Sequence, residues 1–123
     1  MSMERIILEM GSGNDLYGQD YTKAARRAVQ DALHHSSLVF FRSLGIAAAD
    51  MVVKVTIGVQ EPDKVDAALV QPDLPRGKAE VQVVFGGQNV VDIENETTSV
   101  IATAAIEAFV DIDQSKWKLG ETV

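Results

Sequence analysis

Residues 51–59 alternate between two sets of side chains, and this alternation constrains the fold more than any other feature of the chain. The apolar set consists of Met51, Val53, Val55, Ile57 and Val59, and the set between them of Val52, Lys54, Thr56 and Gly58. A period of two is typical of a β-strand that turns one face towards a hydrophobic core. The fold must therefore contain a sheet, and another layer must cover one face of that sheet.

Three further segments have the composition of strands. Residues 4–10 contain a continuous aliphatic run, which is typical of a strand that is covered on both faces. Residues 79–85 alternate in hydrophobicity and end at the turn signal Gly86-Gly87. Residues 90–93 are a candidate fourth strand, which we expect to form a hairpin with residues 79–85; the alternative is a long loop.

Two long segments have the spacing of helices. From Thr22, which is a good N-cap, to about residue 35, apolar residues recur every three or four positions. A second long helix is predicted from residue 97 or 98 to residue 111 or 112, again with a threonine as its cap. A short helical piece is predicted at residues 67–71, with Asp66 as its cap.

These elements predict an α+β domain. We expect a two-layer sandwich in which a mixed sheet of about four strands carries both long helices on one face, as in the chorismate-mutase-like or ferredoxin-like classes. Residues 1–112 are expected to form this single domain and residues 113–123 a C-terminal tail. The second long helix has apolar residues around most of its circumference. The apolar side chains on its outer side must be buried against another subunit, so we expect a homo-oligomer.

The composition argues against several classes of partner. The chain has 123 residues, a net charge of −7 and no cysteine. Nucleic acids and anionic membranes are bound by basic surfaces, so neither is an expected partner. The lack of cysteine excludes disulfides, thiolate metal sites and a cysteine nucleophile. No apolar run approaches the length of about 18 residues that spans a membrane, and no signal peptide is recognisable, so we expect a soluble, cytoplasmic protein.

The glycine-rich stretch at residues 10–20 is the best candidate for a site. It lies between a predicted strand and a predicted helix, where backbone N–H groups meet the positive end of the helix dipole. The candidate ligand-binding residues are Gly11, Gly13, Asp15, Gly18, Gln19, Asp20 and Lys23. The glycine spacing does not match a dinucleotide-binding loop or a P-loop, so no cofactor is identified.

Two interpretations of the carboxylates in this stretch stay open. In the functional one, Asp15 is a catalytic general base, or Asp15 and Asp20 offer oxygen ligands to a hard cation. In the structural one, Asp15 caps the turn with its own side chain, and Asp20 pairs with Lys23 or helps to cap the helix. We assign no metal site.

The string Gly11-Ser12-Gly13-Asn14-Asp15-Leu16-Tyr17-Gly18 resembles the signature G-x-G-x-D-x-H-G. That signature marks the Lin-type conserved hypothetical protein family, first annotated from a listerial genome, and the resemblance extends over residues 4–112. This chain has Tyr17 where the family has histidine. A tyrosine can donate and accept a hydrogen bond, but it does not titrate at neutral pH. The family has no known function, so the resemblance implies a site in this stretch but no activity.

Two other polar segments were considered. His34 and His35 are the only histidines, and adjacent helical positions point about 100° apart, so they cannot chelate one ion together. We expect them to cap the last carbonyls of the first helix. Residues 86–89 are either a solvated turn or a segment that faces the glycine-rich stretch and closes a pocket.

Two hypotheses about function follow. One is a homo-oligomeric small-molecule enzyme or binder with its site between Gly11 and Asp20. The other is a non-catalytic structural or accessory oligomer, in which the glycines only allow close backbone packing. The expected partners are further copies of the chain and, in the first hypothesis, a small molecule.

Overall fold

A computed structural model describes residues 2–34, 51–74 and 78–112. In chain order the elements are β1 (Ser2–Asp15), α1 (Tyr21–His34), β2 (Met51–Val59), η2 (Pro62–Lys64), α3 (Ala67–Val70), η3 (Gln71–Asp73), β3 (Lys78–Phe85), β4 (Gln88–Asp92) and β5 (Thr97–Ile112). The predictions for His35 and for the tail at residues 113–123 lie outside these ranges.

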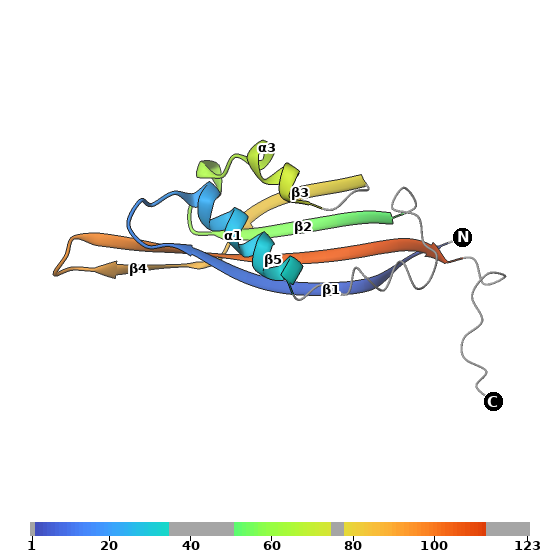
Figure 1. Ribbon diagram of the computed structural model, residues 1–123, viewed down its shortest axis with the longest axis horizontal. Coiled ribbons are helices and arrows are strands. Elements are labelled where there is room, and N and C mark those ends of the chain that lie inside the picture. The colour runs from blue at the N-terminus through green and yellow to red at the C-terminus, as the bar shows by residue number, and fades with distance from the viewer. Residues whose placement is uncertain (1, 35–50, 75–77, 113–123) are drawn as a thin grey trace, which may run out of the picture.

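The five strands form one sheet with β5 at its centre. The strand order is β1-β5-β2-β3, and β4 pairs with the first part of β5. Strand β5 is antiparallel to β1, β2 and β4, whereas β2 and β3 are parallel. Along β5, β4 pairs with residues 97–101 and β2 with residues 103–110. The β4–β5 hairpin therefore extends beyond α1 as an arm of the sheet (Figure 1).

One face of the sheet is covered by α1 and α3 (Figure 1). The β5 side chains on this face are buried: Val100, Ala102, Ala104, Ile106, Ala108 and Val110. The α1 side chains of the same core include four fully buried alanines: Ala24, Ala25, Ala28 and Ala32. Because these side chains are small, the helix axis can approach the sheet closely.

The opposite face, called the open face below, is not covered by any helix of the described residues. The strand registers place on it Arg5, Leu8, Met10, Ser12, Val52, Lys54, Thr56, Glu80, Gln82, Val84, Thr103, Ala105, Glu107 and Phe109. Leu8 is 46% exposed and Met10 66% exposed. Near the start of β1 the face carries charges of both signs. Arg5 pairs with Glu107 at 3.2 Å, and the Lys54 Nζ lies 5.3 Å from the centroid of the Phe109 ring.

The expected sandwich with two long helices is wrong, and so are the chorismate-mutase-like and ferredoxin-like classes inferred from it. The segment predicted as the second long helix is the 16-residue strand β5. On the core face of β5, every second residue from Val100 to Val110 is apolar. On the open face Ile101, Ala105 and Phe109 are apolar as well, which interrupts the alternation with the polar Thr103 and Glu107. Its alanines, which are good helix formers, strengthened the wrong prediction.

The remaining elements correct the prediction in three places and confirm it in others. Strand β1 does not end at Met10 but continues to Asp15. Strand β4 forms its hairpin with β5 and not with β3. Thr22 does not cap α1; its Oγ1 instead accepts the backbone N–H of Asp66 at 2.9 Å. The predictions of β2, of β3 and of a short helix capped by Asp66 are confirmed.

Candidate functional site

Gly11 and Gly13 lie in β1 directly beneath α1. A Cβ atom at Gly11 would lie 2.3 Å from the backbone nitrogen of Ala32, and one at Gly13 would lie 2.3 Å from the backbone nitrogen of Ala28. Real Cβ atoms essentially never come within 3.0 Å of such a backbone atom, so only glycine fits at both positions. In the sheet these two glycines are opposite alanines of β5. The first half of the glycine-rich stretch is therefore a strand that accepts the helix, and not a loop.

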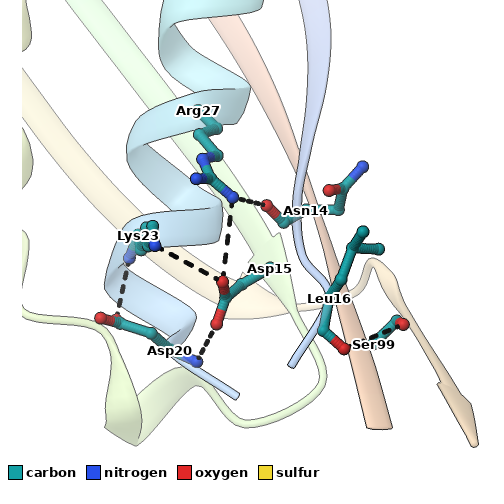
Figure 2. A network of polar contacts seen from close by, with 7 residues as sticks. All are labelled: Asn14, Asp15, Leu16, Asp20, Lys23, Arg27 and Ser99. Carbon is teal, nitrogen blue, oxygen red and sulfur yellow. Dashed lines mark hydrogen bonds and ion pairs between the residues drawn. The ribbon is translucent and has the colours of Figure 1, made fainter. Parts of the chain in front are cut away.

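Asp15 ends β1 and is the centre of a polar network (Figure 2). Its side chain is buried, with 6% of the residue exposed. Its Oδ2 accepts the backbone N–H of Asp20 at 2.9 Å. Its Oδ1 lies 3.8 Å from the Lys23 Nζ and 3.8 Å from an Arg27 guanidinium nitrogen. The carboxylate thus joins the turn to two cations in the first two turns of α1.

Asp20 is the N-cap of α1. Its Oδ1 accepts the backbone N–H of Lys23 at 3.0 Å, and its carbonyl accepts the backbone N–H of Ala24 at 3.0 Å. The turn before it needs unusual geometry at two residues. Gln19 has a positive φ of 48°, and a Cβ at Gly18 would lie 2.8 Å from the Asp15 Oδ2. The carboxylates of the turn therefore serve its own backbone, as in the structural interpretation of the sequence.

Two further contacts connect α1 to the end of β1 and the turn to β5. Arg27 donates to the carbonyl of Asn14 at 2.6 Å, and the Ser99 hydroxyl of β5 donates to the carbonyl of Leu16 at 3.3 Å (Figure 2). The side chain of Leu16 is 48% exposed and that of Tyr17 is 78% exposed. Tyr17, interpreted from the sequence as a replacement of histidine in the resembled signature, is therefore on the surface.

A second polar cluster, which the sequence did not predict, lies beside the first turn of α1. The buried Tyr21 donates its O–H to the Glu61 Oε2 at 2.7 Å and accepts the Asn89 Nδ2 at 2.8 Å. The Lys64 Nζ lies 3.3 Å from the same Glu61 oxygen. The Asn89 Oδ1 is buried without a hydrogen-bond partner among the described residues. In the sequence, Tyr21 fits the apolar face of the helix, and this pattern gives no sign that its hydroxyl is hydrogen-bonded.

The pKa shifts in this cluster oppose acid–base chemistry near pH 7. Burial raises the pKa of Tyr21, and its hydrogen bond to Glu61 raises it further. The hydrogen bond from Tyr21 lowers the pKa of Glu61, and Lys64 adds to this effect. Tyr21 is therefore neutral and Glu61 ionised, so neither is ready to exchange a proton. The cluster connects β4 to the helix, because Asn89 of β4 donates to Tyr21 of α1. Asn89 and Asp15 lie opposite the same β5 residue, Val100, on its two edges.

The open face contains a shallow hollow of about 580 Å³. Most of the residues that line it are small or carry a hydroxyl: Gly11, Ser12, Thr56, Gly58, Val84, Gly86, Thr103, Ala104 and Ala105. Met10, Asp31 and Phe85 complete the lining. The Asp31 Oδ2 accepts the backbone N–H of Ser12 at 2.9 Å, so α1 also binds the outer edge of β1.

The described histidine does not join the polar network around Asp15. His34 is the last residue of α1, away from the turn at its N-terminus. In the described ranges, no group of three or more His, Asp or Glu residues is positioned to hold a metal ion. No helix of these ranges is both long and apolar enough to cross a membrane.

Comparison with known proteins gives a family but no activity. Residues 5–108 match the model of a conserved hypothetical protein family, Lin0512. The fold is similar to a crystal structure described as an FtsZ-like protein of unknown function from Nostoc punctiforme PCC 73102. The TM-score is 0.78 and the identity 32%, over 91% of this chain and 99% of that one. No curated protein matches the chain.

Proposed function

This chain belongs to the Lin0512 family of conserved hypothetical proteins, and we propose that it is a non-catalytic, self-associating protein. In this proposal the glycines of β1 serve the packing of α1, and the open face of the sheet is buried against a second copy. This is the accessory-oligomer hypothesis of the two that the sequence left open. Residues 97–112 are a strand and not a helix, so the apolar surface available for self-association is the open face of the sheet.

The open face is the observation that carries this proposal. A sheet with one face on the core normally has polar side chains on the other. Here the second face carries Leu8 and Met10, both about half exposed or more, next to a hollow of small residues. A long flexible side chain beside a hollow is self-complementary, because in a twofold dimer each Met10 can enter the hollow of its partner.

The contacts of the turn support a structural role for the glycine-rich stretch. Both acids accept backbone N–H groups of the turn or of α1, and the nearest cations lie against Asp15. An anionic ligand at the N-terminus of α1 would have to compete with two carboxylates that are already there. A catalytic role for Asp15, and the interpretation of Tyr17 as the replacement of a family histidine, stay predictions.

Native mass spectrometry of freshly purified protein tests the proposal, because it reports the number of subunits and any retained ligand together. We expect an oligomer without a retained small molecule. Met10→Lys, which places a charge on the open face, should reduce the number of subunits. Gln30→Lys on the exposed side of α1 is the matched control and should not.

Two outcomes would overturn the proposal. One is a wild-type monomer at micromolar concentration. The other is a stoichiometric small molecule that the wild type retains and that Asp15→Asn loses, which would favour the small-molecule binder instead.

A further inference from the structure

Strand β4 has one edge with no strand beside it in the described part of the chain. Its five residues pair with β5 along one edge only, with Val90 opposite Ser99. The other outer strands have side chains bonded to their backbone. Asp31 accepts the N–H of Ser12 in β1, and Gln71 donates to the carbonyl of Ala79 in β3. Within the described ranges we find no such contact along the outer edge of β4.

The sequence of β4 gives its edge only limited protection. Proteins commonly block edge strands with charged residues, above all lysine, with proline or a bulge, or by keeping the strand short. Strand β4 is short, but its sequence QNVVD contains no lysine or proline, and its one charge, Asp92, lies at its end. Val90 is 46% exposed and Val91 is 64% exposed, and they lie on opposite faces of the strand. A β-branched edge of this kind readily pairs with another strand.

One register makes this edge complementary to itself. When two β4 strands run antiparallel with Val90 opposite Val90, each Gln88 lies opposite an Asp92 of the other copy. The Gln88 amide can then donate to the Asp92 carboxylate, and the two valines pack together. In the register shifted by two residues, Val91 lies opposite itself and each Asp92 faces a Val90, which leaves the carboxylate unpaired. The first register is therefore favoured.

The tip of the hairpin is held in shape for such pairing. Asp92 accepts the backbone N–H of Asn95 at 3.3 Å and the Asn95 Nδ2 at 2.8 Å. These bonds close the turn at residues 93–96 and keep the end of β4 extended. A carboxylate has about four acceptor sites, so Asp92 can still accept an amide from a second copy.

We propose that β4 pairs antiparallel with β4 of a second copy, about a twofold axis at Val90. This register joins two sheets into one continuous sheet of ten strands, with the helices of both copies on the same side. The open faces of both copies also lie on one side and remain free. The proposal rests on the proposed self-association and adds a second, independent interface, so that two such dimers packed face to face would form a tetramer.

Cysteine crosslinking tests the register, because the chain has no cysteine of its own. Residues directly opposite one another in antiparallel strands have Cα atoms about 4.5–5.5 Å apart, which a disulfide can bridge. Val90→Cys should therefore give a covalent dimer under mild oxidation. Val91→Cys is the matched control: it is more exposed, but in this register it faces Asn89 of the other copy and should not crosslink.

Substitutions that introduce opposite charges at Val90 give a second test of the β4 interface. Val90→Lys and Val90→Glu should each lose the β4 interface, because like charges would face each other. Mixing the two variants should restore it as a one-to-one complex, which light scattering and native mass spectrometry detect. Circular dichroism shows whether each variant is folded.

The outcomes separate this inference from the proposed function. If Val91→Cys crosslinks as efficiently as Val90→Cys, the register is wrong. The register is also wrong if the protein is an oligomer in which Val90→Cys gives no crosslink. In both cases the proposed self-association would still hold. A Val90→Cys crosslink in a protein whose subunit number is unaffected by Met10→Lys would retain the β4 interface and reject the open face. A wild-type monomer at micromolar concentration would reject both.

Discussion

The substitution Gly13→Ala tests the packing of α1 on β1. The added Cβ would lie 2.3 Å from the backbone nitrogen of Ala28 and 2.6 Å from the carbonyl oxygen of Ala24. Both contacts are with backbone atoms, so no side-chain rotation can relieve them. The helix has to move away by about 1 Å, and it thereby loosens the packing of its buried face.

The magnitude follows from two opposing effects. Overpacking of a tight core costs about 1–3 kcal/mol, and we expect the upper end because the clash is with backbone. Alanine also restricts the unfolded chain relative to glycine, which stabilises the folded state by about 0.4–1 kcal/mol. The expected net loss is about 2 kcal/mol in the free energy of unfolding. At roughly 4 °C per kcal/mol for a chain of this size, Tm should fall by about 8 °C.

Urea unfolding followed by circular dichroism, at equal protein concentrations, measures this loss. Ser12→Ala is the matched control, because Ser12 is the exposed neighbour on the other face of β1, and its effect should stay within about 0.5 kcal/mol. Adding Ala28→Gly should not rescue Gly13→Ala, since the clash is with the backbone of Ala28 and not its side chain. A Gly13→Ala variant as stable as the wild type, or rescue by Ala28→Gly, would refute the reasoning.

Three further predictions concern the polar contacts around the first turn of α1. Asp20→Ala removes the acceptor of the Lys23 N–H and should cost about 1 kcal/mol in urea unfolding, whereas Asp20→Asn should cost less. Asp15→Ala leaves the Asp20 N–H without its acceptor and should cost about 2–3 kcal/mol; Asp15→Asn, which keeps an acceptor, should cost less, and equal losses would contradict this assignment. Tyr21→Phe should cost about 1 kcal/mol at pH 7. Because Tyr21 lowers the pKa of Glu61 in the folded state, the stability from Glu61 is present above its ordinary pKa of 4.5 and is lost as the pH falls through the folded-state pKa. Unfolding measured from pH 7 to pH 3 should therefore show a smaller acid loss in Tyr21→Phe than in the wild type, and parallel curves would count against the link.

The sequence predicted best those elements whose two faces differ. In β2, apolar residues alternate with Lys54 and Thr56, and the structure has a strand with the same bounds. In α1, the alanine stripe and the charged opposite face are both visible in the sequence. The short helix after Asp66 was recognised from its cap, which accepts the N–H of Ala68 at 3.0 Å.

The prediction failed where tertiary contacts override local pattern. Strand β5 carries the apolar Ile101, Ala105 and Phe109 on its open face, so its period of two is interrupted, and its alanines suggest a helix. The continuation of β1 through Gly11 and Gly13 was missed because glycines in a strand usually signal a break. Here they mark the close approach of a helix that lies far outside the local pattern.

The candidate site could be predicted only in part, for a related reason. Asp15 and Asp20 are recognisable from the sequence as polar groups of the turn, but their hydrogen-bond partners depend on how α1 is placed. The bond between Tyr21 and Asn89 joins residues 68 positions apart, and no local pattern indicates it. The spacing of residues in the sequence therefore does not predict the cluster of Tyr21, Glu61 and Asn89.

The pairing of β1 with β5 has a consequence for synthesis of the chain. These strands join the two ends of the described fold, with Ser2 opposite Ile112 and Asp15 opposite Val100. β1 therefore leaves the ribosome on the order of 100 residues before the strand that must lie beside it. At about 5–20 residues per second this delay lasts about 5–20 s, during which β1 has no β5 to pair with. During that time the aliphatic side chains of β1 and its unpaired backbone groups are exposed, which is the condition under which a nascent strand aggregates.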